Sequence, residues 1–560
     1  MIRGTTPLEI GNIADHLTLQ AQERPYSLAI AAPAGRDSSG RTRHVHYTYR
    51  QLEDDSNRIA AGLLQLGIGP GVRTALMVTP GLDLFAVVFA LLKSGAIPVL
   101  VDPGLGRKGI GSCLADAAPE AFIGIPKAHL ARRLFGWGRQ TVRTAITVGG
   151  KGWGATTLQE VRRRGSQAAR PGTSTRPEDV AAILFTSGST GAPKGVVYTH
   201  QTFLGQVERI RTTYDIRPGE IDLPTFPLFA LFDPALGMAA VIPEMNPTRP
   251  ADVDPRRIIQ AIEDFGVTNM FGSPALINAV GRYGEKHGTK LPTLRRVLSA
   301  GAPVPAAVLE RFAGMLNEDT QVFTPYGATE ALPVASIGSD EVLTETRQQT
   351  ESGNGVCVGL PVAGVDVDVI PIHDRAIDRW DDAGTLPRGE IGEIVVRGDH
   401  VTREYFRRPA ETALAKIVDP SAPVRHRMGD VGYLDDRGRL WFCGRKSHRV
   451  LLDDGTTLHT IPCEGVFNVH PAVYRTALVG VTEAGRTLPV LCVELEAGAA
   501  IDPATLRREL AALGKAHDHT RIIERFLIHP AFPVDIRHNA KIFREKLAVW
   551  AAAQTAPAAS

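Results

Sequence analysis

LFTSGSTGAPKG, the sequence of Leu184–Gly195, joins an apolar run to a loop of hydroxyls, glycines and one lysine. The run Val180–Phe185 predicts a short buried strand, so the loop follows a strand end. Glycines let a backbone turn tightly and present its N–H groups to an anion, and Lys194 adds a mobile positive charge. A flexible Gly/Ser linker is the alternative, but such linkers rarely follow a buried strand or end in Pro-Lys-Gly. The loop is therefore predicted to hold phosphate through Thr186, Ser187, Gly188, Ser189, Thr190, Gly191 and Lys194.

The loop does not match a Walker A motif, G-x-x-x-x-G-K-[ST], because Pro193 stands where the second glycine belongs. It resembles instead the signature loop of the adenylate-forming superfamily, TSG-[ST]-TG-x-PKG, and matches it at every position. The superfamily comprises acyl-CoA synthetases, peptide-synthetase adenylation domains and luciferases. The resemblance implies that the loop holds the β- and γ-phosphates of ATP while a carboxylate attacks the α-phosphate.

Composition and charge exclude several classes of protein. The 560 residues include 62 Lys and Arg against 60 Asp and Glu, and a net charge of +2 gives no reason to expect a nucleic-acid or anionic-membrane partner. The five cysteines have no C-x-x-C spacing, which favours reduced thiols in a cytoplasm over a disulfide framework or a zinc site. The N-terminus lacks a signal-peptide core, and the longest apolar run, Leu84–Leu92, is too short for a transmembrane segment.

Helical and strand-like patterns alternate before the phosphate loop. Helices are predicted over 49–66 and 82–93, and strands over 74–78 and 97–101. This β-α-β order predicts a parallel sheet with helices on its faces, and therefore an α/β fold. Residues 150–178 are rich in Arg, Gly, Ser and Thr and are predicted to form a surface connector.

A second motif, Thr324–Glu330, reads TPYGATE and resembles the superfamily sequence YG-x-[ST]-E. The resemblance assigns Tyr326 and Gly327 to the adenine site, because an aromatic ring can stack on a base. Thr329 would bond a phosphate or the AMP, and Glu330 would supply a hard oxygen ligand for Mg²⁺. A glutamate that starts a helix, where its charge suits the helix dipole, is the alternative for Glu330.

Small residues end another predicted strand, within Arg296–Pro303. Small side chains allow a flat ring to lie on the backbone, and the superfamily places adenine at this position. Gly301, Ala302 and Pro303 are therefore candidate adenine-binding residues, although small-residue strand ends are common in any α/β fold.

Two motifs in the second half of the chain are assigned to the ribose by the same resemblance. Arg425–Tyr433 matches [YWH]-x-TGD except that Met428 replaces threonine, and Asp430 would accept hydrogen bonds from both ribose hydroxyls. A carboxylate in a surface turn is the alternative. Leu440–Ser447 resembles the hinge before the C-terminal domain, and Arg445 would contact the ribose.

The resemblance also fixes the expected domains. It implies a large N-terminal adenylation domain, 1–445, built of parallel-sheet βαβ subdomains plus a distorted barrel, and a small mobile α+β domain, 446–560. Phe532–Arg544 resembles P-x-[TD]-x-x-x-NGK-x-x-R, with alanine in place of the glycine. Lys541 is then the candidate catalytic lysine, which would neutralise charge as the carboxylate meets the α-phosphate, and it acts with Lys194 and Glu330.

Three departures from acyl-CoA synthetases bear on the second half-reaction. Pro227–Ala230 reads PLFA where those enzymes usually have PLFH, and Arg449–Glu464 is longer and more acidic than their hinge loop. The lysine motif reads HNAK instead of NGK. These departures weaken the case for a CoA acceptor.

The same segments, with SAGAPVP and HRMGDVGY, resemble the β-lactone synthetase branch of bacterial olefin and β-lactone biosynthesis. The resemblance implies that MgATP and a long-chain 2-alkyl-3-hydroxyalkanoic acid give an acyl-AMP, whose 3-oxygen then closes a β-lactone and releases AMP. It also makes an assembly with a pathway hydrolase and reductase plausible. A medium- or long-chain fatty acyl-CoA (or acyl-carrier) ligase and a non-enzymatic acyl-adenylate-binding scaffold are the alternatives. No base is assigned, since His200 and His426 are expected to be structural.

Overall fold

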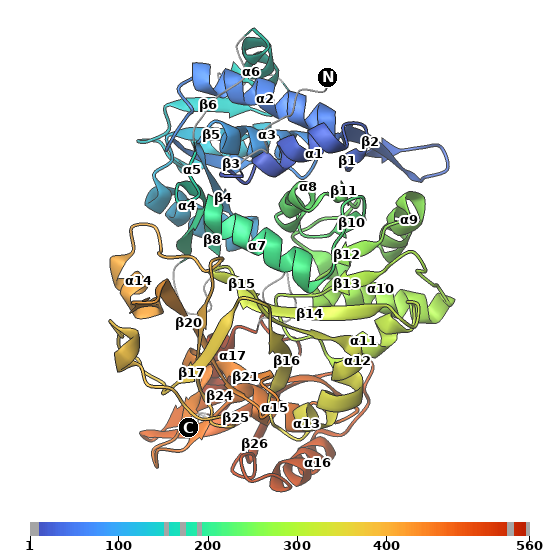
Figure 1. The fold of residues 1–560 in the computed structure, drawn as a ribbon. Coiled ribbons are helices and arrows are strands. Elements are labelled where there is room, and N and C mark those ends of the chain that lie inside the picture. The colour runs from blue at the N-terminus through green and yellow to red at the C-terminus, as the bar shows by residue number, and fades with distance from the viewer. Residues whose placement is uncertain (1–9, 151–155, 168–174, 187–192, 535–541, 556–560) are drawn as a thin grey trace.

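Two large β-sheets and a smaller C-terminal one organise the computed structural model, which describes residues 10–150, 156–167, 175–186, 193–534 and 542–555 (Figure 1). The first sheet has the order β7-β6-β5-β3-β4-β8-β9, and its strand pairs are parallel except β8–β9. This is the predicted parallel sheet. Its strands are β3 (Arg73–Met77), β4 (Ile97–Val101), β5 (Ala121–Gly124), β6 (Thr144–Thr147), β7 (Thr156–Thr157), β8 (Val180–Thr186) and β9 (Lys194–Thr199).

The helices around this sheet follow their local signals. Helix α2 begins after Thr48, whose side chain accepts the N–H of Gln51, and Gly67 follows its end with a left-handed φ of +74°. Helix α3 has the predicted bounds, and its apolar side chains are buried in the core that α2 and the sheet share. The helices are α2 (Tyr49–Gln65), α3 (Leu82–Lys93), α4 (Gly106–Ala117), α5 (Pro126–Phe135), α6 (Leu158–Gly165) and α7 (His200–Thr213).

The prediction of a surface connector over 150–178 was wrong in part, because α6 lies within it. Leu158 and Val161 are buried, and α6 packs directly on α2. The approach is so close that a Cβ on Gly62 would lie 2.2 Å from the Val161 carbonyl oxygen. Gly62 allows the backbones of the two helices to touch. The sequence did not predict α6 because two apolar residues among several arginines give too weak a helical periodicity.

The second sheet has 14 strands and joins two architectures. From β11 through β10, β12 and β13 to β14 the neighbouring pairs are parallel, whereas β14–β15–β16 and the strands beyond are antiparallel, where the distorted barrel was expected. The strands are β1 (Leu28–Arg36), β2 (Thr42–Thr48), β10 (Ile221–Pro224), β11 (Ala239–Val241), β12 (Asn269–Phe271), β13 (Arg296–Leu298), β14 (Gln321–Ala328), β15 (Ala331–Gly338), β16 (Val356–Pro361), β17 (Asp366–Ile370), β18 (Gly392–Arg397), β19 (Lys416–Asp419), β20 (Ala422–Leu434) and β21 (Leu440–Arg445).

The second sheet also carries its own helices, of which Figure 1 shows α9, α10 and α11 beside β12–β14. Their apolar faces form one core with these strands, centred on residues such as Ile262, Val297 and Phe312. The bounds are α8 (Asp233–Leu236), α9 (Pro255–Phe265), α10 (Pro274–His287), α11 (Ala306–Ala313), α12 (Ser339–Glu341), α13 (Arg347–Glu351) and α14 (Pro409–Ala415). Helix α1 (Asp15–Glu23) packs against α2 and α8.

The C-terminal part of the chain forms a three-stranded sheet, β24-β25-β26, with its own core. It follows a short 3₁₀ turn at Lys446–His448 and the hairpin β22–β23. Figure 1 shows this part at the lower end of the molecule, beneath β21. Its elements are β22 (Val450–Leu451), β23 (Thr457–Leu458), α15 (Thr460–Phe467), β24 (Val473–Glu483), β25 (Arg486–Leu495), α16 (Pro503–Lys515), β26 (Arg525–Ile528) and α17 (Arg544–Thr555).

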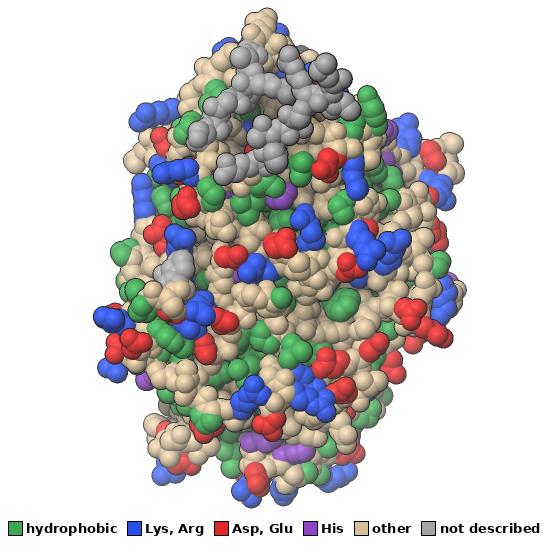
Figure 2. All heavy atoms as spheres, in the orientation of Figure 1, with side chains coloured by type: hydrophobic (Ala, Val, Ile, Leu, Met, Phe, Trp, Pro, Cys, Tyr) green, Lys and Arg blue, Asp and Glu red, His purple; other side chains and the backbone are tan. Residues whose placement is uncertain are grey.

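The surface carries mixed charge. Figure 2 shows basic and acidic side chains interspersed over one face of the molecule, without a large area of one sign. All five cysteines are free and buried. Within the ranges that the structure describes, no helix is long and apolar enough to cross a membrane.

His200 predicts a pH dependence of stability. It is 1% exposed, its Nδ1 accepts the N–H of Ile13 at 3.2 Å, and burial lowers its pKa to about 4. The unfolded chain, with a pKa near 6.5, therefore binds more protons between pH 6.5 and 4, so stability is lost as the pH falls through this window. We expect about 2 kcal/mol of this loss between pH 7 and 5 to come from His200.

Urea unfolding at pH 7 and pH 5 tests this expectation. A His200→Asn variant, whose amide oxygen can still accept the Ile13 N–H, should lose about 2 kcal/mol less than the parent protein between these two pH values. Equal losses in the two proteins would contradict it.

Candidate active site

Three of the predicted nucleotide residues meet where the C-terminal parts of β14 and β21 approach the middle of β20. The Tyr326 hydroxyl donates to Asp430 Oδ2 at 2.7 Å, and Arg445 Nη1 lies 3.0 Å from Asp430 Oδ1. Asp430 is 3% exposed and sits within β20, so the alternative of a carboxylate in a surface turn does not hold. The negative charge of Asp430 is the main cause that raises the pKa of Arg445, and Tyr326 adds a smaller effect. The guanidinium therefore stays charged. These three residues, Tyr326, Asp430 and Arg445, form the nucleotide triad. It places a fixed carboxylate next to a cation.

Glu330 lies in the tight turn between β14 and β15, so the alternative of a glutamate that starts a helix was wrong. Gly327 allows this turn, because a Cβ there would lie 2.6 Å from the Ala331 carbonyl oxygen. The Thr329 carbonyl accepts the Tyr198 hydroxyl, and the Glu330 carbonyl accepts the N–H of Thr402 at 2.9 Å. The turn is therefore held from both sides by its backbone.

The Glu330 carboxylate is also held. The Tyr405 hydroxyl donates to Glu330 Oε1 at 2.6 Å. Burial acts to raise the pKa of Glu330, but His426, the Tyr405 hydroxyl and Lys416 together lower it below its usual value. Glu330 is consequently an anion at neutral pH, which is the form that binds a hard cation.

Lys194 lies close to this carboxylate through the same tyrosine. Its Nζ is 5.0 Å from the centroid of the Tyr405 ring, a cation–π distance. Tyr405 pairs with Val196 of β9 in an antiparallel bridge, which fixes this proximity. Lys194 and Glu330 thus contact the same tyrosine. Residues 187–192 of the phosphate loop, with the predicted Ser187, Gly188, Ser189, Thr190 and Gly191, lie outside the described residues, and of Thr186 only the backbone pairing with Lys194 is described.

The predicted adenine turn follows β13, next to the strand that carries Tyr326. β13 and β14 are parallel neighbours, so Gly301, Ala302 and Pro303 lie at the same sheet edge as the start of TPYGATE. Gly301 adopts a left-handed φ of +100°, which favours glycine. Gly301 and Pro303 are exposed, and the turn is open to a ligand.

The predicted catalytic Lys541 lies outside the described residues, but both ends of its segment are described. Val534 and Ile542, which flank the segment, form an antiparallel bridge. Arg544 then pairs with the buried Glu464 through both guanidinium nitrogens. His448 of the hinge turn has its pKa lowered to about 4 by burial and by the charges of Arg544 and Arg445. Arg544 and the hinge residue His448 are thus close enough for their charges to interact.

Sequence reasoning missed the residues that hold Glu330. Tyr198, Thr402 and Tyr405 were not assigned a role. Lys416 was missed too: it is 7% exposed, and burial lowers its pKa to about 7. A lysine within the otherwise apolar segment Leu414–Val418 was the available signal.

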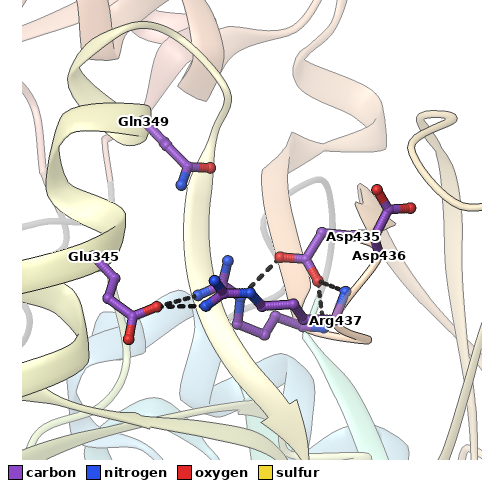
Figure 3. A pocket seen from close by; sticks show the side chains of 6 residues that line it. Glu345, Gln349, Asp435, Asp436 and Arg437 are labelled. Carbon is purple, nitrogen blue, oxygen red and sulfur yellow. Dashed lines mark hydrogen bonds and ion pairs between the residues drawn. The ribbon is translucent and has the colours of Figure 1, made fainter.

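A surface hollow near the β20–β21 turn is not this site. Figure 3 shows carboxylates that already pair with arginines there, for example Glu345 with Arg437 at 2.7 Å. None of the predicted nucleotide residues lines it. The lining residues are Glu345, Gln349, Asp435, Asp436, Arg437 and Arg439.

Comparison with known proteins places the chain in a family. The AMP-binding enzyme family model matches residues 17–406. An olefin beta-lactone synthetase from Xanthomonas campestris pv. campestris is 53% identical over 97% of this chain and 98% of that protein. The chain belongs to the olefin β-lactone synthetases, within the AMP-binding enzymes. A second olefin beta-lactone synthetase, from Stenotrophomonas maltophilia, is 52% identical over the same shares of the two chains.

Solved structures agree with this placement at the level of the fold. The amide bond synthetase McbA from Marinactinospora thermotolerans superposes with a TM-score of 0.76 over 96% of this chain and 99% of that one, at 23% identity. As a member of the AMP-binding enzymes, the chain is an adenylate-forming, ATP-dependent ligase. The predicted α/β adenylate-forming fold is therefore confirmed.

Proposed function

We propose that this β-lactone synthetase adenylates a long-chain 2-alkyl-3-hydroxyalkanoic acid and cyclises it without a second substrate. The observation that carries the proposal is the similarity above 50% identity to olefin β-lactone synthetases along nearly the whole chain. One carboxylate oxygen attacks the α-phosphorus of ATP and pyrophosphate leaves. The 3-oxygen then attacks the activated carbonyl carbon, the bond to the AMP oxygen breaks, and the hydroxyl proton is released. An intramolecular nucleophile that is already close gains a high effective concentration.

The nucleotide is proposed to lie across the C-terminal ends of β13 and β14 and the middle of β20. Asp430, with both oxygens oriented by Tyr326 and Arg445, would accept the ribose hydroxyls. The exposed turn at Gly301–Pro303 would receive the adenine, and Lys194 with the phosphate loop would bind the β- and γ-phosphates. Lys541 would stabilise the charge on the α-phosphate as the carboxylate approaches.

Mg²⁺ fits this site through one protein ligand. Mg²⁺ is usually bound by one or two carboxylates and by substrate phosphates, not by an all-protein cage. Glu330 supplies an ionised carboxylate beside Lys194, whereas no group of three or more His, Cys, Asp or Glu side chains able to hold a metal occurs in the described parts of the chain. When bound, Mg²⁺ would neutralise phosphate charge, and the chain's own part is to hold Glu330 in place.

One of the departures from acyl-CoA synthetases, the longer and more acidic segment 449–464, lies directly after the hinge turn. The segment 449–464 forms the hairpin β22–β23 and the start of α15, and Asp453 and Asp454 lie in the hairpin turn. Acidic residues there disfavour the phosphates of CoA by repulsion. We propose the domain boundary of 1–445 and 446–560 at this hinge, with the second domain mobile. A cytoplasmic location and an assembly with a pathway hydrolase and reductase belong to the same proposal.

Product analysis by mass spectrometry tests the function. The purified protein is given MgATP and a racemic 2-alkyl-3-hydroxy acid, with and without CoA. We expect a product lighter than the acid by one water, formed together with AMP and independent of CoA. A thioester that appears only with CoA would make the protein an acyl-CoA ligase instead.

A further inference from the structure

We infer that Tyr405 is a positioning residue that sets Glu330 against Lys194, and that Lys416 anchors the segment that carries it. This inference rests on the proposed roles of Glu330 in binding Mg²⁺ and of Lys194 in binding phosphate. Tyr405 contacts Glu330 through its hydroxyl and Lys194 through its ring. Tyr405 is 6% exposed, so its ring and hydroxyl are held in one orientation by the surrounding protein.

The two contacts of Tyr405 use different parts of its side chain. The hydroxyl donates to Glu330 Oε1 at 2.6 Å, and this bond leaves the carboxylate one preferred orientation. The ring lies 5.0 Å from Lys194 Nζ, so its negative face attracts the ammonium. The distance between the predicted metal carboxylate and the predicted phosphate cation is thus set through one rigid side chain.

The backbone around Tyr405 is fixed to the same two elements. The Phe406 N–H donates to the Gly195 carbonyl at 2.7 Å, directly after Lys194. At the other end, Thr402 donates to the Glu330 carbonyl through its N–H at 2.9 Å and its hydroxyl at 3.2 Å. The segment 402–406 therefore connects the strand that leaves the phosphate loop to the turn that carries Glu330.

Lys416 anchors this segment at Thr402. Its Nζ donates to the carbonyl of Thr402, and also lies 3.2 Å from the Thr402 hydroxyl. Placing a lysine amine at a buried position is unfavourable unless it is well paired. An apolar side chain could fill the same space without this cost. The buried amine is therefore explained by its bonds to Thr402, which in turn bonds the Glu330 carbonyl.

Binding of the fluorescent nucleotide mant-ATP to the full-length protein, with MgCl₂ and with EDTA, tests the inference. The readout is the dissociation constant in EDTA divided by the dissociation constant in MgCl₂. A large ratio means that the metal contributes strongly to nucleotide binding. We expect Tyr405→Phe to lower this ratio about tenfold, as removal of a group that orients a metal ligand does, and to leave the metal-free affinity unchanged. Tyr405→Leu should in addition weaken metal-free binding about threefold, because the ring beneath Lys194 is lost.

Two further variants separate positioning from general stability. Tyr214→Phe removes an equally buried hydroxyl, which bonds Ser336 at 3.1 Å, and should lower the melting temperature without changing the ratio. Lys416→Met should lower the ratio in the same direction as Tyr405→Phe. In a Glu330→Gln background, Tyr405→Phe should have no additional effect on the ratio, since its partner is gone.

The outcomes distinguish the inference from the function on which it rests. If Glu330→Gln abolishes the effect of the metal while Tyr405→Phe leaves the ratio unchanged, Tyr405 does not position Glu330 and the inference is overturned. If Glu330→Gln itself leaves the ratio unchanged, the proposed metal role of Glu330 is wrong, and the inference fails with it.

Discussion

An Asp430→Asn enzyme should lose about two to three orders of magnitude in kcat/KM for ATP. The carboxylate is buried between the Tyr326 hydroxyl and Arg445, and both contacts use its charge. The amide keeps the shape but accepts on one atom only, so at least one of the two proposed ribose hydrogen bonds would be lost and the Arg445 charge would lose its partner. Charge-assisted hydrogen bonds contribute about 1.5–3 kcal/mol each, which gives this range.

Pyrophosphate exchange kinetics with varied ATP measure this effect. Asp435→Asn is the matched control, because Asp435 lies at the end of the same strands and pairs with Arg439 at 2.8 Å, away from the triad. The control should lose stability and keep its KM for ATP. A KM for ATP that rises equally in both variants would show that Asp430 acts through the stability of the strands alone.

An Arg544→Met variant should destabilise the C-terminal part by about 3–5 kcal/mol and lower the rate of adenylation. Arg544 pairs with Glu464 through both guanidinium nitrogens, and Glu464 is 4% exposed. Removing one partner leaves a buried charge uncompensated. Arg544 also follows Lys541 by three residues, so we expect the loss of the Arg544–Glu464 pair to affect the proposed catalytic lysine as well.

Thermal unfolding and pyrophosphate exchange measure the two effects. Arg525→Met is the control, since Arg525 pairs with Glu483 at 2.5 Å on the surface of the same sheet and such a pair contributes about 0–1 kcal/mol. Adding Glu464→Gln to Arg544→Met should restore part of the stability by removing the unpaired charge. If Arg544→Met behaves like Arg525→Met, the ion pair does not hold the lysine segment.

The elements that the sequence predicted are those whose signals are local. The bounds of α3 follow from an apolar run that stops at Lys93 before Gly95, and those of β4 from an apolar run that stops before Asp102 and Pro103; both were confirmed. Helix α6 was missed because its stability depends on the close contact of Gly62 with Val161, which is a property of two helices together. A one-dimensional pattern does not contain such a contact.

The candidate site divides in the same way. Tyr326, Asp430 and Arg445 could be named because each lies in a motif, and the structure brings them together. The residues that orient Glu330 could not be named, because their role arises from pairing between β9 and the segment around Tyr405. Side chains that position a ligand are recognised by what they contact, and those contacts join residues far apart in the chain.

The measurement that most directly tests the proposed reaction follows the oxygen atoms. A 2-alkyl-3-hydroxy acid labelled with ¹⁸O on both carboxylate oxygens is converted in the absence of CoA, and AMP and the product are analysed by mass spectrometry. Adenylation followed by attack of the 3-oxygen predicts one ¹⁸O in AMP and one ¹⁸O in a β-lactone. Unlabelled AMP, or a lactone that retains both labels, would contradict an acyl-adenylate that is closed by its own 3-oxygen.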